Sequence, residues 1–152
     1  MGSTLQRLVL IALVFGLVYF LESEPVSVVP ASTDRIVNQL TASNSTIAEA
    51  YENRRSNLQV EGSGVVTRIL SDDNNGDRHQ RFIIGLQSGQ TLLVAHNIDL
   101  APRISSLKVD DAVEFFGEYE WNDQGGVMHW THKDPRGRHV AGWLKHNGRM
   151  YQ

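Results

Sequence analysis

An uninterrupted apolar run, LVLIALVFGLVYFL, extends from Leu8 to Leu21 without a charged residue. Arg7 precedes the run, Glu22 follows it, and the next basic residue is Arg35. A basic flank before an apolar segment, with an acidic residue after it, keeps the amino end in the cytoplasm and exports the remainder of the chain. The pattern therefore predicts a signal anchor or signal peptide over residues 1–24.

The length of the run and the residues after it help to distinguish a signal anchor from a cleaved signal peptide. As a helix, these fourteen residues would span about 21 Å, less than the roughly 30 Å hydrocarbon core of a bilayer. That length is typical of a signal peptide, but residues 22–25 offer no cleavage signal and Val29-Pro30-Ala31 lies far downstream. We favour an uncleaved anchor, with residues 8–21 crossing the inner membrane once and a periplasmic domain. Cleavage would instead release the protein into the periplasm.

The segment that follows combines two prolines with several serines and threonines, which disfavour long regular elements. Thr46 and Glu49 have the spacing of a capping box, which predicts a short helix ending near Asn57. We therefore expect residues 25–57 to form a spacer that contains a short helix.

From residue 58 onward, apolar and polar positions alternate with a period of two, which is typical of strands with one buried face. Phe82, Ile84 and Leu86 share one such face. Turn sequences separate the alternating segments, and Asn147-Gly148 is typical of a two-residue type I′ hairpin turn. The expected strands are Leu58–Leu70, Gln80–Gln87, Gln90–His96, Val113–Trp121, Val127–His132 and a closing hairpin over residues 143–151.

The order of these strands predicts the fold. Three strands, a short helix or irregular crossover over residues 98–107, and two further strands follow the order of an OB-type barrel. A closed barrel leaves no strand edge exposed, which suits so small a domain. We predict a mainly β fold: a small OB-like five-stranded barrel over residues 58–152 with an extra C-terminal hairpin, preceded by an N-terminal membrane helix.

The composition narrows the chemistry that this barrel can carry. The 152 residues include 14 Lys+Arg, 17 Asp+Glu, 6 His and no Cys, for a net charge of -3. The lack of Cys excludes disulfides, thiolate metal sites and a thiol nucleophile. All 6 His lie between residues 79 and 146, and residues 127–152 carry five Lys/Arg, four His and one acid.

Several specific segments lie between Val60 and Gln152: HQRF at 79–82, SGQTLLVAHNIDLAPRI at 88–104, GEYEWN at 117–122, GGVMHWTHKDPRGRH at 125–139, GW at 142–143 and the closing HNGRMY. With these segments, the stretch resembles a bacterial domain family of unknown function. The resemblance implies an exported or membrane-anchored domain with an OB-like fold. It implies no activity, so any function rests on the residues themselves.

The strand expected over residues 127–132 has one face that is more apolar than the other. Met128, Trp130 and His132 share that face, which we expect to point inward. A one-residue bulge at Gly125-Gly126 gives the hairpin register that matches apolar with apolar residues, whereas a hairpin without it places Tyr119 opposite His129. The bulged register pairs Trp121 with Met128, Tyr119 with Trp130, Glu120 with His129 and Glu118 with Thr131. It gathers two carboxylates and one imidazole on the outer face.

This outer patch has three interpretations. His129 beside Glu120 suits acid–base catalysis, because a carboxylate fixes the tautomer of an imidazole that exchanges protons near neutral pH. Imidazole and carboxylate groups also bind divalent ions such as Zn²⁺, Mn²⁺ or Mg²⁺, for which His129, His132, His139 and Glu118 are candidate ligands. The third interpretation is an ordinary solvated strand face.

Three further polar residues also have more than one interpretation. Asp134 either accepts backbone N–H bonds in a turn or orients His132 or His139. His96 ends the third strand, where it is either structural or part of the ligand face of an OB-type barrel. His79, at a strand start, is expected to be structural or on the surface. The candidate catalytic residues are His129, His132, Asp134, His139 and Glu120.

Cationic and aromatic side chains around the histidines indicate the ligand. Local positive charge attracts anionic groups, and aromatic platforms beside it suit single-stranded nucleic acid or sugar rings. The tryptophans could equally belong to the core. The candidate substrate-binding residues are Arg136, Arg138, Lys145, Trp130, Trp143 and His96. The expected partner is an anionic polymer, DNA or RNA.

These features predict an envelope-side nuclease or phosphodiesterase built on His and carboxylate groups, with a divalent metal as the candidate cofactor. The Asp-Gly-Asp-Thr segment of the familiar OB-fold thermonucleases is absent from the chain, so such an enzyme would use a different site. The alternative is a non-catalytic OB-fold module that binds nucleic acid, glycan or a protein partner. A third hypothesis is haem or metal handling, because a membrane-anchored OB-fold haem chaperone uses a His near a Tyr, as His146 and Tyr151 stand here.

Overall fold

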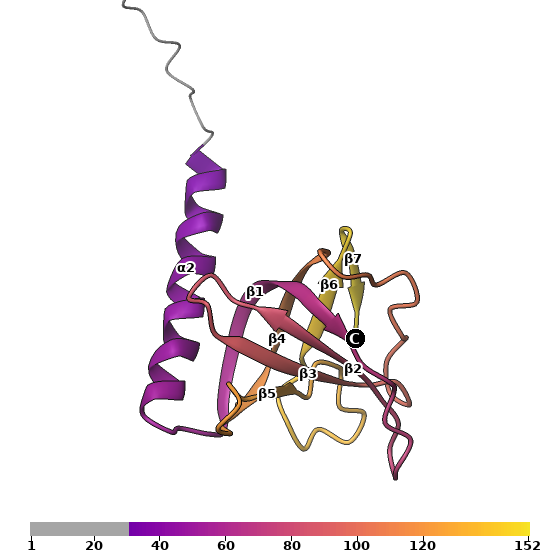
Figure 1. The fold of residues 1–152 in the computed structure, drawn as a ribbon. Helices are drawn as coiled ribbons and strands as arrows, with labels where there is room; N and C mark the ends of the chain where they lie inside the picture. Colours follow the sequence, from indigo (N-terminus) through magenta and orange to yellow (C-terminus); the bar gives the residue numbers. More distant parts are fainter. Residues whose placement is uncertain (1–30) are drawn as a thin grey trace, which may run out of the picture. The chain divides into compact units, whose positions relative to one another are not determined.

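The computed structural model describes residues 31–152, and these form one helix and seven strands (Figure 1). The helix is α2 (Ala31–Glu52), and residues 32–152 form one compact unit. The strands are β1 (Leu58–Ile69), β2 (His79–Gly85), β3 (Thr91–Asn97), β4 (Ala112–Glu120), β5 (Val127–His129), β6 (Trp143–His146) and β7 (Arg149–Tyr151).

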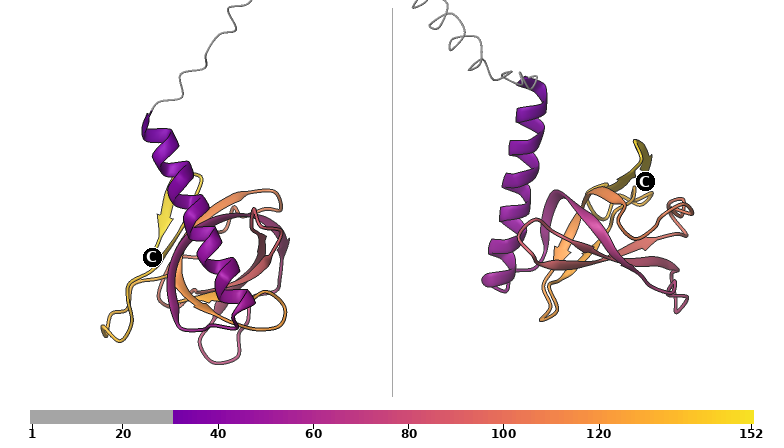
Figure 2. Two further views of the ribbon diagram at one scale, coloured as in Figure 1. Left: turned by 90° about the vertical axis from the view of Figure 1, so that its left-hand side faces the viewer. Right: turned by 45° about the horizontal axis from the view of Figure 1, so that its top comes forward.

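The first five strands close into a barrel, as predicted. Their order is β1-β2-β3-β5-β4, and a β1–β4 pairing closes the ring. The pairing of β3 with β5 is parallel, whereas the other neighbours are antiparallel. The left-hand view of Figure 2 shows the strands curving round this ring. The fold is therefore the small OB-like barrel, with β6 and β7 added beside β4 as the extra hairpin.

Strand β1 serves both neighbours because it is long and bent. Its first part pairs with β4 and its last part with β2, and the register with β2 shifts between Val66 and Arg68. Two glycines, Gly62 and Gly64, lie before this shift and permit close packing. A Cβ atom at Gly62 would lie 2.7 Å from the Phe115 ring, and one at Gly64 would lie 2.8 Å from a backbone oxygen of β2.

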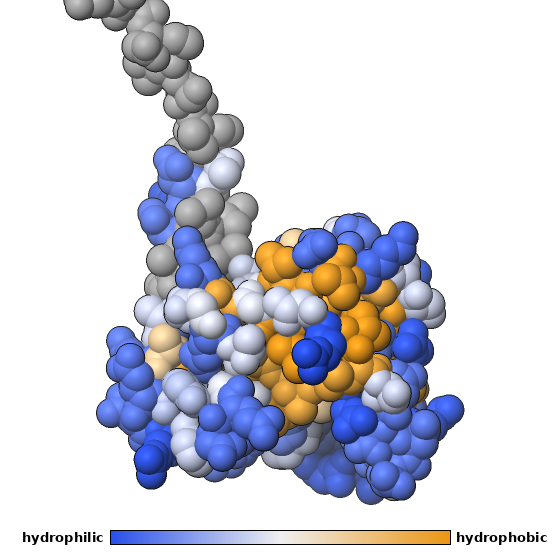
Figure 3. Space-filling model, in the orientation of Figure 1, coloured by the Kyte–Doolittle hydropathy of each residue, from blue (hydrophilic) through white to orange (hydrophobic). Residues whose placement is uncertain are grey.

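The core follows the predicted alternation. Phe82, Ile84, Phe115 and Tyr119 are fully buried, and Leu86 is 5% exposed. Burial of side chains of this size contributes about 1.5–3 kcal/mol each. Apolar side chains are not confined to the interior, since Figure 3 shows a broad hydrophobic area on the surface of the barrel.

Helix α2 is longer than the predicted short helix near Thr46. It begins at Ala31 because the segment to Glu52 contains neither Gly nor Pro to interrupt it. Its last turns pack on the barrel: Ile47 and Ala50 belong to the core, and the indole Nε1 of Trp121 donates to the carbonyl of Tyr51 at 3.1 Å. No helix within residues 31–152 is long and apolar enough to cross a membrane. The predicted anchor, residues 1–24 with the run 8–21, lies outside the described residues.

Strand β5 differs from its prediction in length and register. It ends at His129, and the next residue, Trp130, has a left-handed backbone with φ of 50°. The pairs are Glu118 with His129, Tyr119 with Met128, and Glu120 with Val127. The bulged register predicted for this hairpin is therefore wrong, as is the register without a bulge.

The loop between β4 and β5 explains this register. Gly126 has a φ of +104°, and a Cβ atom there would lie 2.2 Å from the Tyr119 ring. The Tyr119 hydroxyl donates to the carbonyl of Gly125 at 3.2 Å. Tyr119 thus folds over the glycine pair and pins Met128 opposite itself. Because the observed register differs from the predicted one by two residues, the outer-face cluster of Glu118, Glu120 and His129 is preserved.

The chain beyond β5 departs from the predicted inward face. Trp130 is 37% exposed rather than buried, because its left-handed backbone breaks the strand alternation. Thr131 is fully buried in its place, and His132 is buried as predicted. Residues 98–107 form an irregular crossover without a helix. The closing hairpin turns at Asn147 and Gly148 with positive φ at both residues, as a type I′ turn requires.

Candidate metal centre and adjoining groove

Glu118 and Glu120 on β4 and His129 on β5 meet on the outer face of the barrel. One ligand atom from each lies within 4.8 Å of the others, which is a separation that a single metal ion can bridge. The Nε2 atom of His129 lies 3.6 Å from Oε1 of Glu118. This cluster, which we call the metal triad, joins three of the residues that the sequence proposed as metal-binding or catalytic.

The His129 Nε2 atom is buried and has no hydrogen-bond partner. The 3.6 Å separation from Glu118 is too long for a hydrogen bond. Buried polar atoms are normally satisfied, so an orphaned nitrogen facing two carboxylates requires an explanation. A divalent cation provides one, because an imidazole lone pair and carboxylate oxygens are ligands for Mn²⁺ or Zn²⁺. The residues therefore fit a metal ion.

The environment of the metal triad shifts the pKa values of two of its members, Glu118 and His129. Burial raises the pKa of Glu118, and the neighbouring Glu120 carboxylate raises it further. Burial lowers the pKa of His129, which Glu120 partly opposes. A cation would favour the ionised carboxylates and the neutral imidazole that metal ligation needs.

An aromatic stack extends from the metal triad. The ring centroid of His129 lies 4.9 Å from that of Trp130, and Trp130 stacks on His139 at 4.6 Å. His139 in turn meets His132 edge-on at 5.1 Å. The structure thus brings the three predicted ligands His129, His132 and His139 into one neighbourhood, but only His129 joins the two glutamates among the described residues.

Three histidines here have a fixed tautomer. The Nδ1 atoms of His79, His132 and His139 each lie 2.8 Å from a backbone carbonyl oxygen, those of Asp77, Lys133 and Val140 respectively. A carbonyl cannot donate, so each Nδ1 carries the proton and each neutral ring keeps a lone pair on Nε2. Burial also lowers the pKa of His132, which keeps that ring neutral.

Asp134 organises the loop that carries the predicted cations. Its side chain is 1% exposed and accepts backbone N–H bonds from Arg136 at 2.8 Å, from His139 at 3.3 Å and from Arg138. These donors lower its pKa to about 2. The turn interpretation of Asp134 therefore describes its contacts, while its Oδ2 also lies 4.0 Å from His139 Nε2.

Three adjoining hollows form a groove beside the metal triad. The central hollow, of about 350 Å³, is lined by residues that include His79, Asn97, Trp130 and His132. The Arg81 hollow, of about 390 Å³, shares His79, Ala95 and His129 with it. The Arg136 hollow, of about 360 Å³, shares Asp77, Asn97, Leu100 and Arg138 with the central one.

Several groove residues were not among the candidate site residues, namely His79, Asp77, Asn97 and Arg81. The register explains their place, because His79 pairs with Asn97 where β2 begins and β3 ends. Pairing the two predicted strands as a hairpin would already have placed the start of one strand beside the end of the other. His79 was instead expected to be structural or on the surface.

His96 lies beneath the groove rather than on its surface. It is fully buried, its Nδ1 lies 2.8 Å from the Thr131 hydroxyl, and its Nε2 lies 3.3 Å from the carbonyl of Pro102. Burial lowers its pKa to about 4. The substrate-binding role predicted for His96 is inconsistent with this position, because both ring nitrogens are bonded inside the protein.

The remaining candidates lie on β6, outside the three hollows. Lys145 Nζ bonds to Glu114 at 3.0 Å, and the ring of Trp143 lies 6.3 Å from that of Phe116. His146 and Tyr151, the pair on which the haem hypothesis rests, are both buried. His146 is 1% exposed with Nε2 bonded to Asp111 at 2.8 Å, and Tyr151 is 6% exposed.

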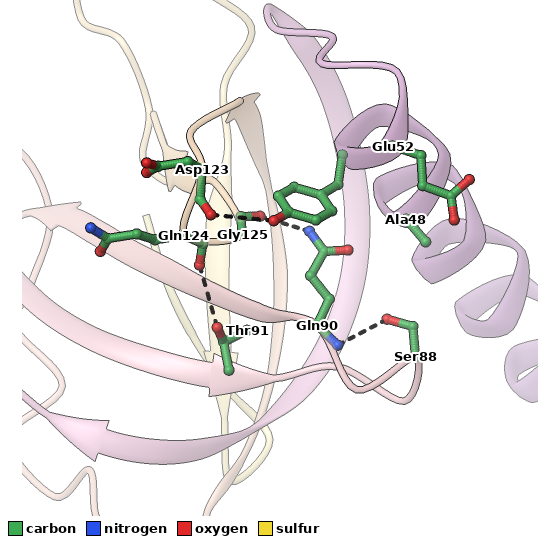
Figure 4. Close-up of a pocket in the computed structure, with 9 residues that line it drawn as sticks. Ala48, Glu52, Ser88, Gln90, Thr91, Asp123, Gln124 and Gly125 are labelled. Carbon is green, nitrogen blue, oxygen red and sulfur yellow. Dashed lines mark hydrogen bonds between the residues drawn. The ribbon is translucent and has the colours of Figure 1, made fainter.

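A further hollow, of about 420 Å³, lies between α2 and the turns of the barrel (Figure 4). Two of its side chains bond to backbone carbonyls: the Gln90 amide nitrogen donates to Gly125 at 2.6 Å, and the Thr91 hydroxyl donates to Gln124 at 3.4 Å, while the Gln90 Oε1 atom has no partner. The Tyr51 hydroxyl donates to the backbone carbonyl of Asp123 at 3.3 Å. These contacts brace the helix against the barrel and leave no chemistry comparable to that of the groove.

Comparison with known proteins bears out the resemblance found in the sequence. No curated protein matches the chain. A family model described as "Protein of unknown function (DUF3465)" matches residues 29–152, which include α2 as well as the barrel. The match covers most of the chain, and the protein therefore belongs to the DUF3465 family.

Proposed function

We propose that this protein is an envelope-side nuclease or phosphodiesterase that uses a divalent metal held by Glu118, Glu120 and His129. The observation that carries the proposal is the orphaned Nε2 atom of His129, which faces two carboxylates at the edge of a groove. Residues 8–21 would anchor the enzyme in the inner membrane, with the barrel in the periplasm.

The groups around the metal triad match the needs of phosphodiester hydrolysis. A metal bound there would polarise a phosphoryl oxygen and lower the pKa of a bound water. His132 lines the central hollow with a neutral Nε2, which suits it to accept a proton. Arg138 lines the same hollow, with its Nε atom 3.5 Å from Asp134, and would bind a non-bridging phosphate oxygen.

A non-catalytic glycan-binding module is the second candidate, and the pairing of the arginines favours it. Arg78 binds Asp99 at 2.6 Å, and Arg81 lies 3.8 Å from Asp73, so part of the local positive charge is already neutralised. Neutral imidazoles, an amide and an indole also suit the hydroxyl groups and ring faces of sugars. This candidate predicts binding without turnover.

Cleavage assays on the full-length chain distinguish the two candidates. The protein is purified in mild detergent without a His tag and mixed with single-stranded DNA or RNA and Mn²⁺, Mg²⁺ or Zn²⁺ in turn. Hydrolysis should fall at least about 100-fold in Glu118→Gln and His129→Ala. Glu114→Gln is the matched control, since Glu114 lies on the same strand but binds Lys145 outside the groove.

Saturable binding of a glycan without hydrolysis of either nucleic acid in any metal would favour the binding module. Metal-independent cleavage that survives in His129→Ala would overturn the assignment of the metal triad, even if the protein proves to be a nuclease.

A further inference from the structure

Two members of the metal triad, Glu120 and His129, line the groove away from its ends. His129 lines both the central hollow and the Arg81 hollow, and Glu120 lines the Arg81 hollow. On the other side, the central hollow continues into the Arg136 hollow through shared lining at Asp77 and Arg138. A scissile bond held at the metal triad would therefore have room on both sides.

The size of the hollows indicates a ligand of several units. Each of the three measures about 350–390 Å³, near the lower end of the range for small-molecule sites. A single small unit would fill one hollow and leave the other two empty. An arginine lies at either end, Arg136 on one side and Arg81, which lies 3.8 Å from Asp73, on the other, and both could contact phosphates that flank a central one.

The walls of the groove present acceptors to the ligand. His79 and His132 offer Nε2 lone pairs because their Nδ1 protons bond to backbone carbonyls. Asp77 lines the same central hollow. Such acceptors recognise N–H and O–H groups on base edges and sugars, and single strands leave these groups unpaired and splayed. Trp130 is 37% exposed beside them and offers surface for a base.

We propose that the substrate is an extended single strand of nucleic acid that crosses the metal triad with nucleotides on both sides, so that cleavage is internal. This inference rests on the proposed function. In each event the oxygen of water forms a new bond to phosphorus and the bridging P–O bond breaks. One proton of the water ends on the leaving oxygen, and the products are a phosphomonoester and a hydroxyl end.

Closed circular single strands test the inference, because they have no ends. The full-length protein with Mn²⁺ should linearise circular single-stranded DNA or circular RNA, and should cut a duplex of the same sequence at least about tenfold more slowly. Release of mononucleotides from linear strands while circles stay intact would overturn internal cleavage. Equal rates on duplex and single strand would overturn the single-strand assignment. The DNA and RNA arms identify which sugar the groove accepts.

A binding series separates failure of this inference from failure of the proposed function. Fluorescence anisotropy with oligonucleotides of one to eight nucleotides should show affinity rising at least about tenfold over the first few nucleotides and then levelling off. That result without cleavage of any strand would overturn the proposed hydrolase function and support the inference that an extended single strand binds in the groove. If a mononucleotide binds as tightly as an octamer, the inference of an extended strand is wrong, even if cleavage occurs.

Two variants locate the strand. Arg136→Ala should lower the affinity for the octamer several-fold and leave the affinity for the mononucleotide unchanged, because Arg136 lies at one end of the groove. Arg55→Ala removes an exposed cation that follows α2 and lies outside the three hollows, so both affinities should stay at the wild-type value. An equal loss in both variants would show charge attraction without a defined path.

Discussion

The Nε2 atom of His129 lies 3.6 Å from Oε1 of Glu118, buried and without a hydrogen-bond partner. The two residues stand directly opposite each other in the β4–β5 pairing. Their side chains lean together, yet neither satisfies the other, and Glu120 adds a second carboxylate to the same space. The three residues could hold a cation, and under the proposed function the stability of this part of the barrel would depend on the metal that it binds.

Glu118→Gln should have opposite effects with and without metal. Burial and Glu120 raise the pKa of Glu118, so its ionised form is disfavoured in the metal-free fold. The substitution should therefore raise the metal-free Tm by about 2 °C and abolish the further rise that Mn²⁺ produces in the wild type. Thermal melts at pH 7.5 measure both, with Glu114→Gln as the control. A variant that melts lower without metal contradicts the like-charge account.

The buried His96 predicts a loss of stability in acid. Its pKa is lowered to about 4 in the fold and is 6.5 in the unfolded chain, so the unfolded chain binds more protons between these values. Its contribution, about 2–4 kcal/mol, is complete above pH 6.5 and is lost as the pH falls to about 4.

Urea unfolding at pH 7, 5.5 and 4.5 measures this dependence. A His96→Gln variant has no titrating ring at this position, so its free energy of unfolding should start lower and fall less steeply than that of the wild type. Identical slopes in both proteins would mean that another group governs the acid response.

Asp134→Asn separates positioning of the groove from metal binding. Asp134 accepts backbone N–H bonds from Arg136, Arg138 and His139, and none of its described contacts reaches the metal triad. We expect oligonucleotide affinity to fall about tenfold while Mn²⁺ affinity stays unchanged. Isothermal titration of each ligand makes the comparison. A parallel loss of metal would place Asp134 in the metal centre instead.

A pair of glycine substitutions tests the register that builds the metal triad. A Cβ atom at Gly126 would lie 2.2 Å from the Tyr119 ring, whereas one at Gly137 would meet nothing within 4 Å. Both glycines have positive φ, so Gly137→Ala costs about 1 kcal/mol of backbone strain. Gly126→Ala should cost about 3 kcal/mol or more and weaken Mn²⁺ binding as well. Equal destabilisation would show that Tyr119 does not hold the hairpin.

The alternation of apolar residues predicted most of the fold, because Phe82, Ile84 and Leu86 each face the core as their spacing requires. The Asn147-Gly148 pair predicted the turn of the closing hairpin. Neither source determines the register of β5, which depends on Tyr119 folding over Gly126, a contact between different strands. The length of α2 was also missed, since its helical pattern is weak and its burial comes from packing on the barrel.

The composition of the candidate site was predictable only in part. The period of two placed Glu118, Glu120 and His129 on one face, and the observed register kept them there. His79 entered the groove through its pairing with Asn97, which needs the β2–β3 register. His96 was misplaced because a strand end does not reveal that both ring nitrogens find partners inside.

Metal content is the most direct test of the central claim. The full-length protein, purified without a His tag and dialysed against Mn²⁺ or Zn²⁺ and then buffer, is measured by elemental mass spectrometry. We predict about one equivalent in the wild type and in Glu114→Gln, and at least about a tenfold lower content in Glu118→Gln, Glu120→Gln and His129→Ala. A wild-type protein that retains no metal, or a His129→Ala variant that retains the same amount, would contradict the account.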